Sequence, residues 1–158
     1  MLIQELKQKK GGSGEAIAKS MFTMANLRVP IISVIIGEGS SGGALAIGIA
    51  NKVLMLENAV YSILSPEGYS AILWKDSSRC KEAAEKMKMT ADDLYKLKVI
   101  DKIIREPKEV NDISFKKLAQ DMKKEIKNYT LELNKLTKED LYEERYLKFR
   151  NMGEYIKL

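Results

Sequence analysis

The sequence predicts a mixed α/β fold, and three observations carry that prediction. An apolar run, residues 31–36, is interrupted only by Ser33, which is typical of a strand buried on both faces. Four glycines and two serines follow between residues 37 and 43, and the small residues 44–50 then favour a helix. The second half of the chain adds long segments with apolar residues at helical spacing.

The first half of the chain alternates short helices with short strands. The predicted helices are 15–27, 43–50, 69–74 and 77–87, and the predicted strands are 31–36, 53–56 and 60–64. A turn-like Glu57-Asn-Ala separates the second and third strands. Pro66 disfavours helix at Ser65, so residues 65–68 are predicted to be a loop.

The second half is predicted to be mostly helical. Thr90 begins a helix that ends near Lys98, with Asp93 in its first turn, and residues 100–104 form a strand. Six apolar residues mark one face of a long amphipathic helix: Phe115, Leu118, Met122, Ile126, Tyr129 and Leu133. Thr137 then caps a final helix that carries Leu141, Tyr142, Tyr146 and Phe149.

Composition narrows the class of protein. At 158 residues and 45% hydrophobic, the chain can bury one core of ordinary size. No apolar run approaches the roughly 20 residues of a membrane span, and the start lacks a signal-peptide pattern, so a cytoplasmic protein is expected. Histidine is absent and Cys80 is the sole cysteine, which excludes histidine-dependent triads, an internal disulfide and a cysteine metal cluster.

The net charge of +5 does not indicate a nucleic-acid protein. Residues 75–158 hold 21 of the 27 basic and 17 of the 22 acidic residues, and the two signs are interleaved there. This pattern is typical of solvated helical surfaces, so nucleic-acid binding is not expected. The charge pattern is also compatible with a weak basic patch that binds an acidic partner or coenzyme phosphates.

The glycine-rich segment predicts an anion or oxyanion pocket built from backbone amides. A strand that runs through glycines into a helix start leaves several N–H groups without intrahelical partners, and the helix dipole favours negative charge there. Gly37, Gly39 and Gly42 also fit the dinucleotide pattern Gly-x-Gly-x-x-Gly, with Glu57 near the position of its acidic residue. A tight packing turn is a third interpretation.

Longer motifs identify a family. The segments 37–74, 81–85 and 89–107 closely resemble the alpha subunit of bacterial acetyl-coenzyme A carboxylase carboxyltransferase. That subunit is roughly twice as long, so the chain resembles its C-terminal half. The sequence departs from the family pattern at Ser40, where glycine is usual, and at Tyr69, where cysteine is usual.

The resemblance implies a fold and a division of the chain. The implied fold is crotonase-like, a partial ClpP/crotonase spiral of strand–strand–helix units with a helical C-terminal extension. Three parts are expected: a non-family segment or linker at 1–13, a carboxyltransferase core at 14–107, and the helical extension at 108–158. The C-terminal helices cover either the core of this chain or a second chain, with Tyr142, Tyr146 and Phe149 as the contacting side chains.

The resemblance also implies an activity, catalytic residues and partners. A carboxylate would pass from carboxybiotin on its carrier protein to acetyl-CoA to give malonyl-CoA, the first step of fatty acid synthesis in an ATP-dependent complex. The amides of Gly42 and Gly43 would be the catalytic oxyanion donors. The expected substrate-binding residues are Gly39, Ser40, Ser41, Glu67 and Gly68, and no metal is expected in this chain.

The implied partners are a carboxyltransferase beta subunit and the biotin carboxyl carrier protein, in an oligomer that is inactive without the beta subunit. Two alternatives stay open. In the first alternative the chain is a catalytically silent assembly module, and in the second it is a crotonase-type acyl-CoA hydratase or isomerase. The hydratase chemistry would need a pair of carboxylates, for which Glu57 and Glu67 are the convenient candidates.

Overall fold

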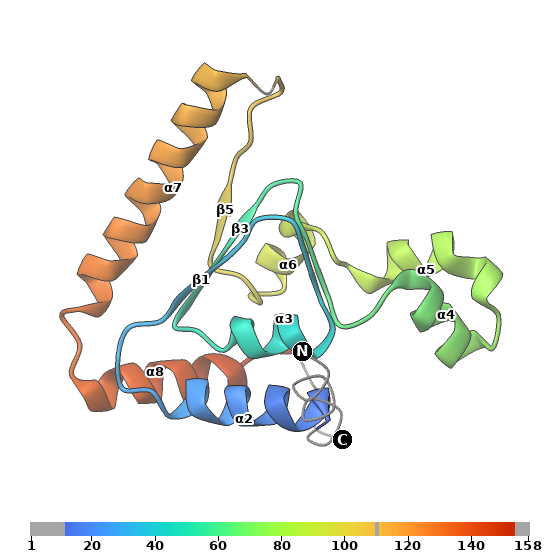
Figure 1. The fold of residues 1–158 in the computed structure, drawn as a ribbon, viewed down its shortest axis with the longest axis horizontal. Coiled ribbons are helices and arrows are strands. Elements are labelled where there is room, and N and C mark those ends of the chain that lie inside the picture. The colour runs from blue at the N-terminus through green and yellow to red at the C-terminus, as the bar shows by residue number, and fades with distance from the viewer. Residues whose placement is uncertain (1–11, 110, 154–158) are drawn as a thin grey trace, which may run out of the picture.

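The structure is a computed structural model that describes residues 12–109 and 111–153 (Figure 1). Its helices are α2 (Ser13–Asn26), α3 (Ser41–Gly48), α4 (Pro66–Trp74), η1 (Ser77–Arg79), α5 (Cys80–Met87), α6 (Ala91–Lys96), α7 (Asp112–Leu133) and α8 (Lys138–Arg150). Its strands are β1 (Ile32–Ile35), β2 (Glu38–Ser40), β3 (Lys52–Leu56), β4 (Val60–Ser62) and β5 (Lys102–Ile104). Most of the predicted segment 1–13 lies outside the described residues.

A parallel three-stranded sheet with the order β1-β3-β5 forms the centre of the fold. Ile32 pairs with Lys52 across the first strand pair, and Leu54 pairs with Lys102 across the second. Residues 53–56 of β3, the central strand, are all buried, and residues of α6 and α7 pack in the same core. The core is therefore built around β3.

The prediction of a strand at 31–36 buried on both faces is wrong in its position. The strand exists, but β1 lies at the edge of the sheet and its burial alternates, with Ser33 and Ile35 buried and their neighbours half-buried. Ile36 is 68% exposed. An apolar run indicates that the side chains of a strand are buried, but helices can bury them as well as neighbouring strands can. The run therefore does not show where the strand lies in the sheet.

A second parallel pair, β2 with β4, was not predicted. Residues 38–40 were expected to be part of a glycine-rich turn, yet Gly39 pairs with Tyr61 in this ladder. A Cβ at position 39 would lie 3.1 Å from Cδ2 of Tyr61, so glycine allows the ring to pack against this strand.

Helices cover the central sheet from several sides. In Figure 1, α3 lies between the sheet and the pair α2 and α8, while α7 slants along the flank. Four half-buried residues of α7 pack against the core: Leu118, Met122, Ile126 and Tyr129. The predicted apolar face of this helix is confirmed, and it covers the core of the same chain. Near the start of α7, where the helix diverges from the sheet, Phe115 is 62% exposed.

A buried polar network that the sequence did not predict fixes α8. Arg145 is only 2% exposed, and its Nη1 donates to Oδ1 of Asn51 at 2.9 Å. Its Nη2 donates to the carbonyls of Ala25 and Leu27. Nδ2 of Asn51 in turn donates to the carbonyl of Leu141 at 2.9 Å. These bonds join α8 to the end of α2 and to the residue that precedes β3.

The helices α4, η1 and α5 project from the rest of the molecule (Figure 1). Trp74 packs there against the guanidinium of Arg79, whose Cζ lies 4.2 Å from the ring centroid, and against the edge of Tyr69. The predicted loop at 65–68 is wrong, because α4 begins at Pro66. Proline disfavours helix only at the residue before it and suits the first helical position. None of the described helices is long and apolar enough to cross a membrane.

Candidate functional site

The candidate site lies where β2 passes into α3. Ser40 is the N-cap residue in an extended conformation, and Ser41 adopts a left-handed backbone with φ of 61°. The helix begins at Ser41, two residues earlier than predicted. Gly42 and Gly43 are thus the second and third helical residues, and their amides are among those that an α-helix cannot pair internally.

The N-terminus of α3 has no side-chain cap. The hydroxyl of Ser40 accepts no capping bond, and the first turn contains no acidic residue. The positive end of the helix dipole is therefore not opposed by a carboxylate from this turn. The same end of the helix is exposed at Ser41 and Gly43. The arrangement offers backbone donors to an anion that arrives from outside.

The glycines of this segment differ in what surrounds them. A Cβ at Gly42 would lie 3.2 Å from Cδ1 of Ile17, so close packing of α2 against α3 accounts for that glycine. A Cβ at Gly43 would meet no atom within 4 Å. Packing within the described chain therefore gives no reason for glycine at position 43, whereas access for an external group would.

A cavity of about 260 Å³ borders the site. It lies between β1, the start of β2 and α3, and it includes Gly39, Ala44 and Gly48. Tyr61 of β4 also lines it. The hydroxyl of Tyr61 donates to the carbonyl of Ala44 at 3.2 Å, and burial raises the pKa of this phenol, so it stays protonated and able to donate.

The sequence did not single out Tyr61. A signal was available in Gly48, a glycine inside a predicted helix of small residues, where no turn requires one. The hydroxyl of Tyr61 lies against Gly48, in the space that a Cβ at that position would fill.

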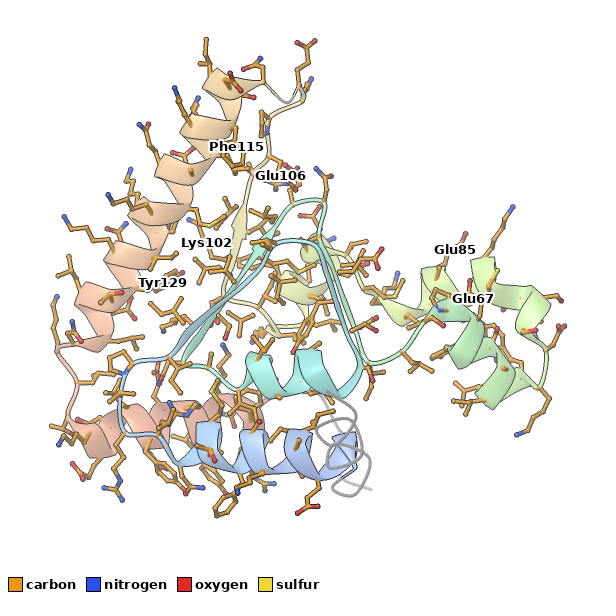
Figure 2. All side chains as sticks on the ribbon, in the orientation of Figure 1. Glu67, Glu85, Lys102, Glu106, Phe115 and Tyr129 are labelled. Carbon is orange, nitrogen blue, oxygen red and sulfur yellow. The ribbon has the colours of Figure 1, made fainter. Side chains whose placement is uncertain are left out.

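Glu67 and Gly68 are not brought to the glycine segment. Both belong to the first turn of α4, and Figure 2 shows Glu67 out on the projecting helices. The amide of Gly68 donates to Oγ of Ser65 at 3.2 Å, which caps α4. The structure therefore gives Gly68 a role in capping, and a substrate-binding role for these two residues stays a proposal.

Glu57 is held in the turn after β3. Its carboxylate accepts bonds from the amide of Glu106 at 3.1 Å and from Nη1 of Arg105 at 2.6 Å. The Glu106 amide and then the Arg105 guanidinium keep the pKa of Glu57 below its usual value. Its carboxylate is thus already engaged by this chain, which counts against a role in binding a dinucleotide ribose.

The carboxylate pair that a hydratase would use is not formed. Glu57 precedes β4 and Glu67 follows it, so the two residues lie beyond opposite ends of that strand. Figure 2 agrees, since Glu106, the partner of Glu57, lies well apart from Glu67. The hydratase alternative therefore loses its proposed residues.

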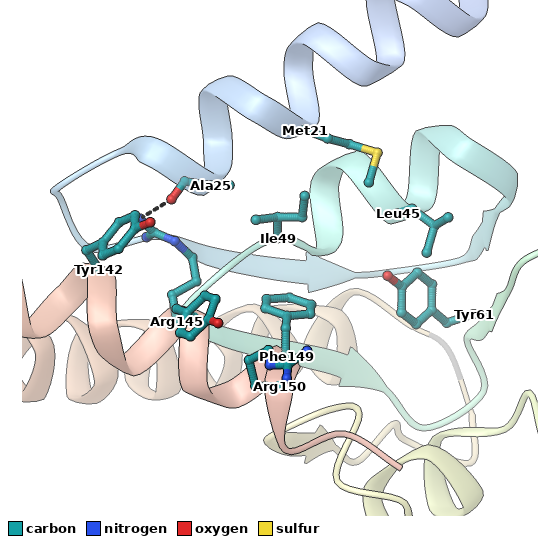
Figure 3. Close-up of a pocket in the computed structure, with 10 residues that line it drawn as sticks. Met21, Ala25, Leu45, Ile49, Tyr61, Tyr142, Arg145, Phe149 and Arg150 are labelled. Atoms are coloured by element: carbon teal, nitrogen blue, oxygen red, sulfur yellow. Dashed lines mark hydrogen bonds between the residues drawn. The ribbon is translucent and has the colours of Figure 1, made fainter.

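A second cavity, of about 360 Å³, lies between α2, α3 and α8 (Figure 3). Its aromatic lining comes from Tyr61, Tyr142, Tyr146 and Phe149. The aromatic residues of α8 thus face α2 and α3 rather than a bare sheet face. Their predicted contact with another chain stays a prediction.

Comparison with known proteins gives the family context. A family model described as acetyl co-enzyme A carboxylase carboxyltransferase-like matches residues 4–153. The match starts within the segment 1–13, for which the sequence analysis recognised no resemblance, and it extends through α8. The boundaries of the three predicted parts stay predictions.

The curated relatives include carboxyl transferase subunits of acetyl-coenzyme A carboxylase. The alpha subunit of Staphylococcus saprophyticus is 52% identical over 91% of this chain and 46% of its own length. The alpha subunit of Clostridium acetobutylicum is 52% identical over 96% of this chain and 55% of its own. The subunits beta/alpha protein of Natranaerobius thermophilus is 55% identical over 92% of this chain and 24% of its own. The chain thus spans about half the length of the alpha subunits it matches.

Solved structures show the fold. A Pseudomonas malonate decarboxylase hetero-tetramer in complex with coenzyme A aligns with a TM-score of 0.65 and 17% identity, over 80% of this chain and 51% of its own. Transcarboxylase 12S aligns with a TM-score of 0.63 and 19% identity, over 82% of this chain and 24% of its own. The predicted crotonase-like fold is confirmed by these neighbours.

Proposed function

This chain belongs to the acetyl co-enzyme A carboxylase carboxyltransferase-like family, and we propose that it supplies the carboxybiotin half of a carboxyltransferase site. The reaction moves a carboxylate from carboxybiotin on a carrier protein to acetyl-CoA and yields malonyl-CoA. The C–N bond of carboxybiotin breaks and carbon dioxide leaves, so negative charge develops on the ureido oxygen of biotin. The amides of Gly42 and Gly43 stabilise that charge by donating hydrogen bonds to it.

The observation that carries this proposal is the open N-terminus of α3. Its first-turn amides have no side-chain cap, and Gly43 meets no neighbour within 4 Å at the position of a Cβ. A ureido oxygen is a compact acceptor that two adjacent amides can share. Gly39, Ser40 and Ser41 shape the approach to these amides, and their substrate-binding role is part of the proposal.

The chemistry requires no nucleophile or metal from this chain. The chain contains no histidine, and the biotin anion that forms when carbon dioxide leaves is basic enough to remove the proton from the methyl group of acetyl-CoA. The enolate that results attacks the carbon dioxide and gives malonyl-CoA. Biotin is accordingly the cofactor, carried on the partner protein. The contribution of this chain is to orient the ureido group and to stabilise its charge.

The partners follow from the length of the chain and from its relatives. The chain spans about half of the alpha subunits it matches, and one relative is named for beta and alpha subunits together. We therefore propose a cytoplasmic oligomer with a carboxyltransferase beta subunit and the biotin carboxyl carrier protein. The beta subunit would hold the thioester, and the chain alone would be inactive.

The test uses the chain reconstituted with a beta subunit and assayed in reverse with malonyl-CoA and a soluble biotin derivative. We expect Gly43→Val to lower the rate by about 10²–10³-fold, because its side chain would keep the ureido oxygen away from the amides, with an effect similar to the loss of an oxyanion donor. Gly14→Val is a matched control, because Gly14 lies in the first turn of α2, another uncapped helix, and a Cβ there would also meet no atom within 4 Å.

The molecular mass of each complex in solution shows whether a variant that has lost activity still assembles with the beta subunit. If the wild-type complex transfers the carboxyl group and the assembled Gly43→Val complex does so at a similar rate, these amides are not the oxyanion donors. A complex that assembles but transfers nothing in its wild-type form would instead support the assembly-module alternative.

A further inference from the structure

Tyr61 touches the β2–α3 unit at three separate points. Its ring packs against Gly39 in the paired strand, where a Cβ would lie 3.1 Å from Cδ2. Its hydroxyl donates to the carbonyl of Ala44 in α3 at 3.2 Å. The same hydroxyl occupies the space in which a side chain at Gly48 would begin. One side chain therefore contacts the strand before the site and the part of α3 from Ala44 to Gly48.

The first turn of α3 has no side-chain cap of its own, although Oγ of Ser33 donates to the carbonyl of Ile47 near the other end of the helix. The helix has eight residues, and the hydroxyl of Ser40 does not cap it. Ser41 has a left-handed backbone that serine seldom adopts, so the turn is held by its surroundings rather than by its own preference. Ile17 packs near Gly42 from the α2 side, and Tyr61 contacts the helix from β4.

Tyr61 also separates two cavities. It lines the cavity of about 260 Å³ beside the glycine segment and the cavity of about 360 Å³ between α2, α3 and α8. Figure 3 shows its ring beside Leu45, with the hydroxyl directed toward α3. Loss of the ring would enlarge both cavities and remove one of the contacts that hold α3.

We propose that Tyr61 is a positioning residue for carboxyl transfer, which holds the first turn of α3 so that the amides of Gly42 and Gly43 point at the ureido oxygen. This inference rests on the proposed function. Oxyanion donors stabilise a developing charge only when they are held in place before the reaction, so a helix free to tilt would be a weaker catalyst. The hydroxyl acts through the Ala44 carbonyl and does not contact the substrate.

The first experiment compares Tyr61→Phe with Tyr129→Phe in the reconstituted complex. Tyr61→Phe keeps the ring packed on Gly39 and removes only the bond to Ala44, so kcat should fall about tenfold while KM for malonyl-CoA stays unchanged. Tyr129 is half-buried against the core and belongs to α7, and its substitution should leave kcat unchanged. Unaltered kcat in Tyr61→Phe, with activity lost in Gly43→Val, would overturn the inference and leave the proposed function standing.

The second experiment tests the steric arrangement without any assay of activity. Gly48→Ala should destabilise the chain, because its Cβ would overlap the Tyr61 hydroxyl. Tyr61→Phe should restore part of the loss, since the nearest remaining atom, Cζ, lies 3.3 Å away. Additive effects of the two substitutions on the midpoint of thermal unfolding would contradict the contact.

Amide hydrogen exchange across residues 42–48 completes the test in the chain alone. Tyr61→Phe should speed exchange there several-fold relative to Tyr129→Phe, because the helix loses an outside anchor. Identical exchange in the two variants would overturn the positioning role, whatever the activity of the complex. If exchange is faster in Tyr61→Phe but the reconstituted wild-type complex transfers no carboxyl group, Tyr61 does hold α3 and the proposed function is wrong.

Discussion

Two helices, α3 and α4, leave the same end of the β2–β4 pair with opposite N-terminal chemistry. Ser40 and Ser62 are register partners in this parallel pair, and α3 and α4 follow them along the chain. At α4, the side chain of Ser65 caps the amide of Gly68, Pro66 has no N–H to satisfy, and Glu67 opposes the helix dipole. At α3, the cap residue is also serine, but its side chain makes no capping bond and no acid follows.

The difference shows how one motif, a serine before a helix, can either complete a helix or leave it open. At α4, Ser65 caps the amide of Gly68 and Pro66 carries no N–H, so fewer donors are left open at that end of the helix. The donors of α3 are left for another acceptor, at a cost in stability that a capping bond would have offset. Open donors beside a glycine with free space around it are what an external oxyanion requires.

Within this comparison, the largest expected effect comes from giving α3 the kind of side-chain cap that α4 has. In Ser40→Asp, a carboxylate in the extended N-cap conformation can accept from the amides of Gly42 or Gly43 and oppose the helix dipole. We expect unfolding free energy to rise by about 0.5–1 kcal/mol while carboxyl transfer falls at least about tenfold. Denaturant unfolding and the reverse transfer assay measure the two effects.

Ser40→Gly is the matched control for that substitution. It removes a hydroxyl that makes no capping bond, so stability and transfer should both change little. If Ser40→Asp raised stability without lowering transfer, the α3 amides would not be the donors that the reaction uses.

Removing the side-chain cap of α4 should have a smaller effect than adding one to α3, and it should change only the stability of the chain. Ser65→Ala removes the acceptor of the Gly68 amide and should cost about 1 kcal/mol of unfolding free energy. Carboxyl transfer per assembled complex should stay at the wild-type rate, because α4 already satisfies its own donors. A selective loss of transfer in Ser65→Ala would show that the start of α4 takes part in the site, as predicted for Glu67 and Gly68.

The last prediction, at Gly43, distinguishes a glycine required by packing from one that leaves room for an external group. Gly43→Ala places a methyl group where no atom lies within 4 Å, so it should stabilise the helix by about 0.5–1 kcal/mol. Gly42→Ala is the comparison, because its methyl group would press on Ile17 and should not give this gain. Equal stability changes at the two positions, measured by thermal unfolding, would contradict the distinction between the two glycines.

Local signals in the sequence predicted most helices well. Thr90 and Thr137 cap α6 and α8 as expected, each by accepting from an amide three residues on. The apolar spacing from Phe115 to Leu133 predicted α7, and the structure adds its cap at Asn111. These features depend on residues within one or two turns, so neighbours in the sequence carry the information.

The sequence also determined the family, because several long motifs in the correct order are specific to it. The resemblance predicted the crotonase-like fold and the role of the Gly42 and Gly43 amides as oxyanion donors. Neither composition nor helical spacing would have distinguished an oxyanion pocket from a dinucleotide loop, since Gly37, Gly39 and Gly42 fit both.

Only the tertiary structure decided which residues support the site. Strand β1 is an edge strand, β2 pairs with β4, and Tyr61 reaches Ala44, because strands far apart in the sequence align in register. Arg145 can be buried because Asn51 and the carbonyls of Ala25 and Leu27 offer it acceptors from two segments that are distant in the sequence. Such contacts arise when distant segments pack together, so the sequence fixes caps and helical faces locally, whereas the position of each strand and the anchor of α3 depend on the assembled fold.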